Sequence, residues 1–195
     1  MNIFIDWINN PTIQNITPKA KSILSQGGVY TFGRDVEDRP IIYLRIGEID
    51  LKNNSLDDYY SAINAVLTVV TKYLFVKGVI ESYLFVIDLN GKNFTSLPID
   101  ATISIIKKLS IVYSMYLGKM AIINTNYLMK LTYLTIKKFI HEETAKKIVL
   151  LGSDEIQNMQ KFVHPNQLEN KYSGSVENLP VYWPPKMASG NDLEE

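Results

Sequence analysis

Apolar residues follow two alternating patterns along the chain, and each pattern predicts a different element. Residues 55–76 carry apolar side chains at 59, 63, 66, 67, 70 and 74, which is the spacing of one helix face. Residues 82–88, "SYLFVID", form a continuous run typical of a strand that is covered on both faces. The remaining predicted elements are strands at 41–46, 119–124 and 146–151 and helices at 98–116, 126–141 and 153–163. This alternation predicts an α/β domain with a mostly parallel β-sheet.

Local signals mark some of the boundaries. Ser55 and Asp58 have the spacing of a capping box at the start of the 55–76 helix. Ser153 is predicted to cap the helix at 153–163. Residues 1–26 are predicted to form short helices broken by prolines and ended by the two glycines that follow.

The helix predicted at 126–141 is apolar around most of its circumference. Only Asn126, Lys130, Lys137 and His141 form a consistent polar stripe. A helix on a soluble core needs one apolar stripe, so a second apolar flank has to contact something else. The alternative is a fully buried core helix, although the polar stripe favours partial exposure.

Composition excludes several classes of protein. The formal net charge is zero, so nothing favours non-specific nucleic-acid binding. The chain has no cysteine, which excludes disulfides and thiolate metal sites. No secretory signal is recognisable at the start, and no uncharged apolar run approaches 18 residues. We therefore expect a cytoplasmic protein.

No catalytic motif stands out. The phosphate-binding G-x-x-x-x-G-K-[ST], the dinucleotide-binding G-x-G-x-x-G and the hydrolase G-x-S-x-G patterns are all absent from the sequence. The two histidines, His141 and His164, lie on separate predicted elements and have no companions at metal-ligand spacing. Acidic pairs at 57–58 and 142–143 fall in first turns of helices, where carboxylates favour the dipole. We expect no enzyme activity, no metal and no cofactor.

Several stretches, in order and at the right spacing, resemble the CRAL-TRIO lipid-binding domain, the family of secretory phosphatidylinositol transfer proteins and the α-tocopherol transfer protein. "GRDVEDRPIIYLR" (33–45) is similar to the family's entry strand, with Asp38 where glycine is usual. "YLFVIDLNG" (83–91) resembles its strand ending in Asp-x-x-Gly. The other matching stretches are "YSMYLGKMAIIN" (113–124), "KKFIHEETAKKIVLLG" (137–152) and, loosely, "LENKYSGS" and "YWPP".

The resemblance implies a mostly parallel sheet floor with helices on one side and a hydrophobic lipid cavity on the other, closed by a gate helix. The gate falls on 126–140, with Leu128 and Leu131 contacting cargo or membrane and Lys130 and Lys137 facing anionic headgroups. It also implies a lipid-binding domain at 27–187, a remnant of the family's N-terminal bundle at 1–26 and a polar tail at 188–195.

Candidate lipid-binding residues follow from the same resemblance. Thr144 and Lys147 stand where phosphatidylinositol-binding members contact the headgroup, and Met115 replaces the family's glutamate nearby. Alternation along the strand at 82–88 places Tyr83, Phe85 and Ile87 on one face, which we assign to the cavity. A lining of this kind favours an apolar or ring-bearing ligand over choline. The full expected lining is Tyr83, Phe85, Ile87, Ile122, Leu128, Leu131, Tyr133, Leu134, Thr144 and Lys147.

Two functions stay open. The first is a carrier that exchanges phospholipid, or another hydrophobic small molecule, with membranes through transient peripheral contact. The second is a lipid-sensing or protein-docking module without transfer activity. Alternative explanations also remain for single residues, because Lys147 could be an exposed lysine at a strand start and Tyr83 and Phe85 could be ordinary core.

Overall fold

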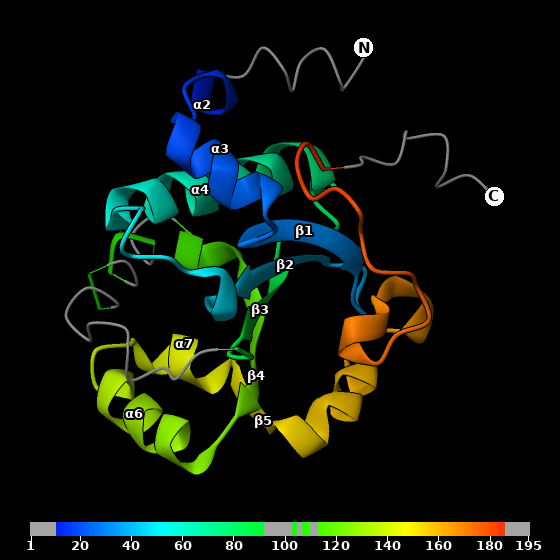
Figure 1. Cartoon of the computed structure of the whole chain (residues 1–195). Coiled ribbons are helices and arrows are strands. Elements are labelled where there is room, and N and C mark those ends of the chain that lie inside the picture. Colours follow the sequence, from blue (N-terminus) through cyan, green and yellow to red (C-terminus); the bar gives the residue numbers. More distant parts are fainter. Residues whose placement is uncertain (1–10, 92–102, 105–106, 110–112, 186–195) are drawn as a thin grey trace.

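The computed structural model describes residues 11–91, 103–104, 107–109 and 113–185, and a five-stranded sheet lies at its centre (Figure 1). The strand order is β1-β2-β3-β4-β5, with β1 antiparallel to β2 and the other neighbours parallel. The strands are β1 (Val29–Arg34), β2 (Pro40–Arg45), β3 (Tyr83–Asp88), β4 (Leu117–Thr125) and β5 (Ile148–Gly152). The predicted α/β class with a mostly parallel sheet is confirmed.

Four of these strands coincide with the predicted ones, and β1 is additional. Its sequence, "VYTFGR", alternates between the two faces of the sheet: Val29 packs in one core and Tyr30 in the other. That alternation could have revealed the strand. The turn to β2 contains Asp38, whose φ is 58°, a backbone conformation that aspartate tolerates better than most residues. This explains how aspartate replaces the usual glycine there.

Helix α4 (Leu56–Val69) begins at the predicted capping box. The Ser55 hydroxyl accepts from the Asp58 amide, and the Asp58 carboxylate accepts from the Ser55 amide at 2.9 Å. The helix continues as a π-helical turn, η2 (Val70–Leu74). On its outer side lie α2 (Pro11–Gln14) and α3 (Pro18–Ser25), and α3 buries Ala20, Ile23 and Leu24 in the same core. The two short helices begin at Pro11 and Pro18, the prolines that were expected to separate them.

The connections from β2 to β3 and from β4 to β5 cross the same face of the sheet. Because the strands in each pair are neighbours and such crossovers are right-handed, the helices between them lie on one side. That side carries α4, α6 (Tyr127–Lys137) and α7 (Glu142–Lys146) (Figure 1). Most of the helix predicted at 98–116 lies outside the described residues.

The opposite face is covered by three 3₁₀ helices, gold and orange in Figure 1: η5 (Ser153–Lys161), η6 (Pro165–Gln167) and η7 (Asn170–Tyr172). The chain at 153–163 is therefore 3₁₀ rather than α-helical. Ser153 is also not its cap, because the amide of Gly152 donates to the Glu155 carboxylate at 2.6 Å. The sheet thus separates two hydrophobic cores.

Candidate functional site

An apolar cavity lies between the sheet and helices α4 and α6. It encloses about 220 Å³. From the sheet it is lined by Leu44, Tyr83, Phe85, Ile87, Leu117, Met120, Ile122, Ile148 and Leu150. From the helices and the segment after α6 it is lined by Tyr59, Ile63, Leu67, Met129, Tyr133, Ile136, Ile140 and Thr144, among others. None of the described lining residues carries a charge. The cavity therefore sits on the helical side of the sheet, not on the opposite side as expected from the resemblance.

Strand alternation decides which side chains face this space. Along β3, Tyr83, Phe85 and Ile87 point into the cavity, whereas Leu84 and Val86 pack in the core on the other face. The placement agrees with the face predicted from the sequence. Contact of these residues with a lipid stays a prediction.

Tyrosine hydroxyls supply much of the polarity of the lining. The Tyr83 hydroxyl donates to the Tyr113 carbonyl at 3.2 Å, and the Tyr113 hydroxyl donates to Asn64 Oδ1 at 2.5 Å. Burial raises the pKa of Tyr59, Tyr83, Tyr113 and Tyr133 above the ordinary tyrosine value. These groups are therefore neutral near pH 7 and add no charge to the lining.

Helix α6 closes one side of the cavity with a narrow stripe. Asn126 caps the helix, because its Oδ1 accepts from the Met129 amide at 2.9 Å. Met129 and Ile136 are the buried residues of α6, and both line the cavity together with Tyr133. Sequence reasoning missed Met129, Ile136 and Ile140 as lining residues. Their spacing, 129, 133, 136 and 140, is nevertheless that of one helix face.

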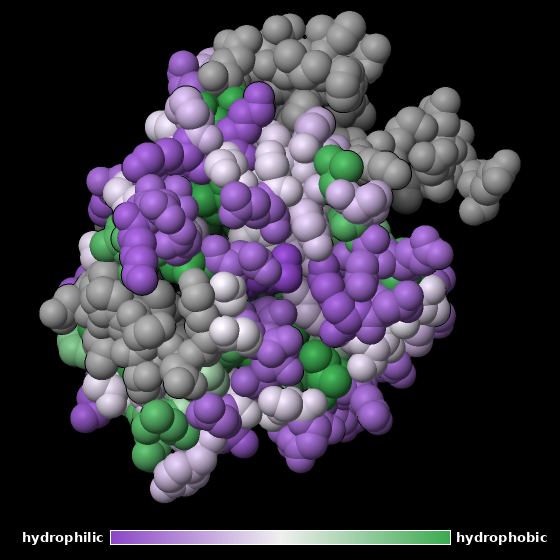
Figure 2. Space-filling model, viewed as in Figure 1, coloured by the Kyte–Doolittle hydropathy of each residue, from purple (hydrophilic) through white to green (hydrophobic). Residues whose placement is uncertain are grey.

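The opposite flank of α6 is apolar and uncovered. Leu128, Leu131 and Leu134 are absent from the cavity lining and are 52%, 44% and 56% exposed. Tyr127 and Phe139 at the helix ends are exposed as well. Figure 2 shows apolar side chains at the lower left of the molecule, where Figure 1 places α6. The three leucines, which were expected to line the cavity, therefore face outward in this structure and do not line it.

The two adjacent lysines at the C-terminal end of α7 have different surroundings. Lys147 is half-buried, and its Nζ donates to the Leu117 carbonyl at 2.5 Å. Lys146 is exposed and pairs with Glu142 and Glu143 at 3.2 and 2.8 Å. Lys147 is thus held beside the start of β4, and Thr144 lines the cavity one helical turn away. Their contact with a headgroup stays a prediction.

Two classes of site find no support in the described part of the chain. Within residues 11–91, 103–104, 107–109 and 113–185, no group of three or more histidine or acidic side chains is arranged to hold a metal ion. Within the same residues, no helix has the length and apolar character needed to cross a bilayer.

Comparison with known proteins agrees with this geometry. The chain is 29% identical over 156 residues to phosphatidylinositol/phosphatidylcholine transfer protein SFH4 of Arabidopsis thaliana. That alignment covers 73% of this chain but 26% of the relative, so the chain corresponds to about a quarter of that protein. The crystal structure of Sfh5 superposes with a TM-score of 0.65 at 16% identity, over 91% of this chain and 72% of that one. The model of the CRAL/TRIO domain matches residues 24–174, and with this match over most of its length the chain belongs to the CRAL/TRIO domain family.

Proposed function

We propose that this protein binds one hydrophobic lipid in the cavity beneath α6 and exchanges it with membranes. The observation that carries the proposal is the pair of apolar flanks on α6. One flank, with Met129, Tyr133 and Ile136, lines the cavity, and the other exposes Leu128, Leu131 and Leu134. A helix built this way can cover cargo with one flank and enter a bilayer surface with the other.

The position of α6 argues for its movement. Met129, Tyr133 and Ile136 line the cavity from this helix, and Met129 and Ile136 are buried. We therefore infer that outward movement of α6 opens the path by which a lipid enters.

The energetics suit a carrier without an energy source. Burial is worth about 0.8 kcal/mol per methylene, so two long chains present roughly 20 kcal/mol of apolar burial. An apolar cavity replaces most of the apolar burial that the membrane provides. The free energies of the lipid in the membrane and in the cavity therefore nearly cancel, and the rate of exchange is limited by opening of the cavity.

Phospholipid is the cargo that the relative's name suggests, and we propose that its headgroup lies near Thr144 and Lys147. The lining itself has no charged side chain among the residues described, so an anionic headgroup would need a cation outside it. Lys147 is the candidate because its ammonium is held beside the start of β4. The same neutral lining also accommodates an apolar or ring-bearing ligand.

The proposal is tested in two steps. Lipid extracted from the natively purified protein is identified by mass spectrometry, and transfer of fluorescent phospholipids between two vesicle populations is then measured. We expect one bound lipid per chain and protein-dependent transfer. An empty protein that takes up neither phospholipid, tocopherol nor retinoid would refute the cavity as a lipid site.

A lipid-sensing or docking module is the second candidate. It is favoured by the observation that the matching region is about a quarter of the plant relative, as in a domain within a longer protein. Such a module would bind lipid but would fail to transfer it between vesicles. The vesicle assay therefore separates the two functions.

A further inference from the structure

The junction between β4 and α6 is held by a side-chain contact that crosses to the next strand. Asn124, two residues before the N-cap of α6, has a φ of 58°, a conformation that asparagine tolerates. Its Nδ2 donates to Asp88 Oδ1 at 2.7 Å, at the end of β3. The direction in which α6 leaves the sheet is therefore tied to Asp88.

Asp88 is buried, with 7% of its surface exposed, and it depends on its donors. Besides Asn124, it accepts from the Asn90 amide at 2.9 Å and from the Tyr172 hydroxyl at 3.3 Å. A buried carboxylate that loses a donor without gaining water is strongly disfavoured. Moving any one donor thus destabilises the arrangement of the other two.

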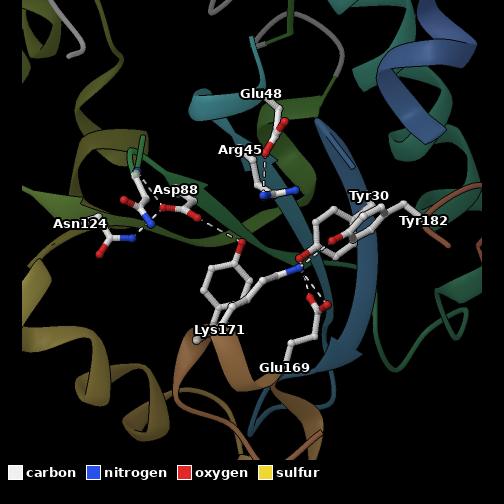
Figure 3. Close-up of polar contacts among 10 residues, drawn as sticks. Tyr30, Arg45, Glu48, Asp88, Asn124, Glu169, Lys171 and Tyr182 are labelled. Carbon is white, nitrogen blue, oxygen red and sulfur yellow. Dashed lines mark hydrogen bonds and ion pairs between the residues drawn. The ribbon is translucent and has the colours of Figure 1, made fainter. Parts of the chain in front are cut away.

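Tyr172 reaches Asp88 from the face of the sheet opposite the cavity. Its ring stacks on Tyr43 with centroids 5.0 Å apart, and Tyr43 stacks on Tyr30 at 4.9 Å. The Tyr30 hydroxyl donates to Glu169 at 2.5 Å, and Lys171 pairs with the same carboxylate at 2.8 Å. Figure 3 shows both ends of this arrangement, with Asp88 facing Asn124 at one end and Glu169 facing Lys171 and Tyr30 at the other. The ring of Tyr172 is therefore fixed in place by a packed stack.

Space for a rearrangement exists on the other side of Asn124. A shallow polar pocket of about 370 Å³ is lined by Asn90, Gly91, Asn124, Asn126 and Ser153. Asn124 could swing into this water-accessible pocket if its bond to Asp88 broke. A change in the positive φ of Asn124 that accompanied this movement would change the direction of α6.

We propose that Asp88, Asn124 and Tyr172 form a latch that fixes the N-terminal end of α6, so that residues on the back of the sheet set how readily the cavity opens. The inference rests on the proposed function in one respect, namely that α6 moves when lipid exchanges. In the latched state α6 lies over the cavity. In the open state Asn124 leaves Asp88, the carboxylate turns away from Tyr172, and water entering the polar pocket replaces both donors. These three are positioning residues, since none of them lines the cavity.

The test uses the absence of native cysteine from the chain. Ile136→Cys places a single thiol on the cavity flank of α6, where Ile136 is 4% exposed. The rate at which a water-soluble maleimide labels this thiol, measured without lipid, reports how often α6 opens. Leu134→Cys, on the exposed flank, measures the intrinsic reactivity of a thiol on the same helix.

In the Ile136→Cys background, Tyr172→Phe removes the hydroxyl and keeps the ring stack. We expect labelling to be about threefold to tenfold faster, because the hydrogen bond from Tyr172 to the charged Asp88 is lost. The increase is limited because this bond is long, at 3.3 Å. Tyr43→Phe is the matched control: it removes a buried hydroxyl from the same stack, one that has no hydrogen-bond partner among the described residues. We expect it to change labelling by less than about twofold.

Asn124→Gly is the second variant, because glycine accepts the positive φ and lacks the side chain. It should accelerate labelling in the same direction, with thermal unfolding showing that both variants remain folded. The latch is refuted if neither variant accelerates labelling, or if Tyr43→Phe accelerates it as much as Tyr172→Phe. Since labelling needs no lipid, failure of the latch is distinct from failure of lipid transfer, which the vesicle assay measures on the unmodified chain.

Discussion

Tyr133 and Leu134 are consecutive residues of α6 with opposite surroundings, because Tyr133 lines the cavity whereas Leu134 is 56% exposed. The helix therefore has two apolar flanks that serve different environments. Substitutions on the two flanks, and in the cores that the sheet separates, should have different effects.

Leu128→Asp and Leu131→Asp should reduce vesicle binding and lipid exchange while leaving the fold intact. Both side chains are about half exposed, so each charge stays hydrated and should change the free energy of unfolding by no more than about 0.5 kcal/mol. Ile123→Asp is the comparison, since Ile123 is fully buried in β4 and an unpaired charge there should unfold the domain. Vesicle co-sedimentation and thermal denaturation measure the two effects. If the leucine variants unfold like Ile123→Asp, α6 is core and the gate proposal fails.

Lys130→Ala and Lys137→Ala should each weaken binding to anionic vesicles by about 1 kcal/mol, the usual contribution of one lysine near such a surface. The loss should shrink as salt is raised, since the ions screen the attraction. Lys161→Ala, an exposed lysine in η5 on the other side of the sheet, is the control and should have no effect. Equal losses for all three lysines would show that no particular face docks on the membrane.

Lys147→Ala should weaken binding of an anionic phospholipid more than that of a neutral one. Alanine removes the charge and the donors while the apolar lining stays, and the preference lost should be about tenfold to a hundredfold. Lys146→Ala is the matched control, because Lys146 is exposed and paired with Glu142 and Glu143. Binding constants for both lipids are measured by fluorescence titration. Equal losses for the two lipids would assign Lys147 a structural role through its bond to Leu117.

Ile87→Phe should fill part of the cavity and lower ligand uptake without destabilising the protein, because the larger ring enters empty apolar space. Val86→Phe, one residue earlier on β3, points into the closed core on the other face. It should cost about 1–3 kcal/mol through overpacking. Urea denaturation and lipid uptake are measured for both. Undiminished uptake by a folded Ile87→Phe protein would place the ligand elsewhere.

Local patterns were sufficient for much of this fold. The capping box of Ser55 and Asp58 marks the start of α4 because both partners lie within one helical turn. The alternation of Tyr83, Phe85 and Ile87 identifies one face of β3, since the strand period is set by backbone geometry. The short-range apolar spacing likewise predicted α4, α6 and four of the five strands in the described part of the chain.

Tertiary structure alone decided where the cavity lies and which flank of α6 faces it. The side of the sheet depends on the handedness of crossovers between whole elements, which no local pattern contains. On α6, the flank of Met129 and Ile136 and the flank of Leu128 and Leu131 are both apolar, so periodicity cannot choose between them. Packing against the sheet makes that choice. The contact of Tyr172 with Asp88 joins residues 84 positions apart, and only the folded chain brings them together.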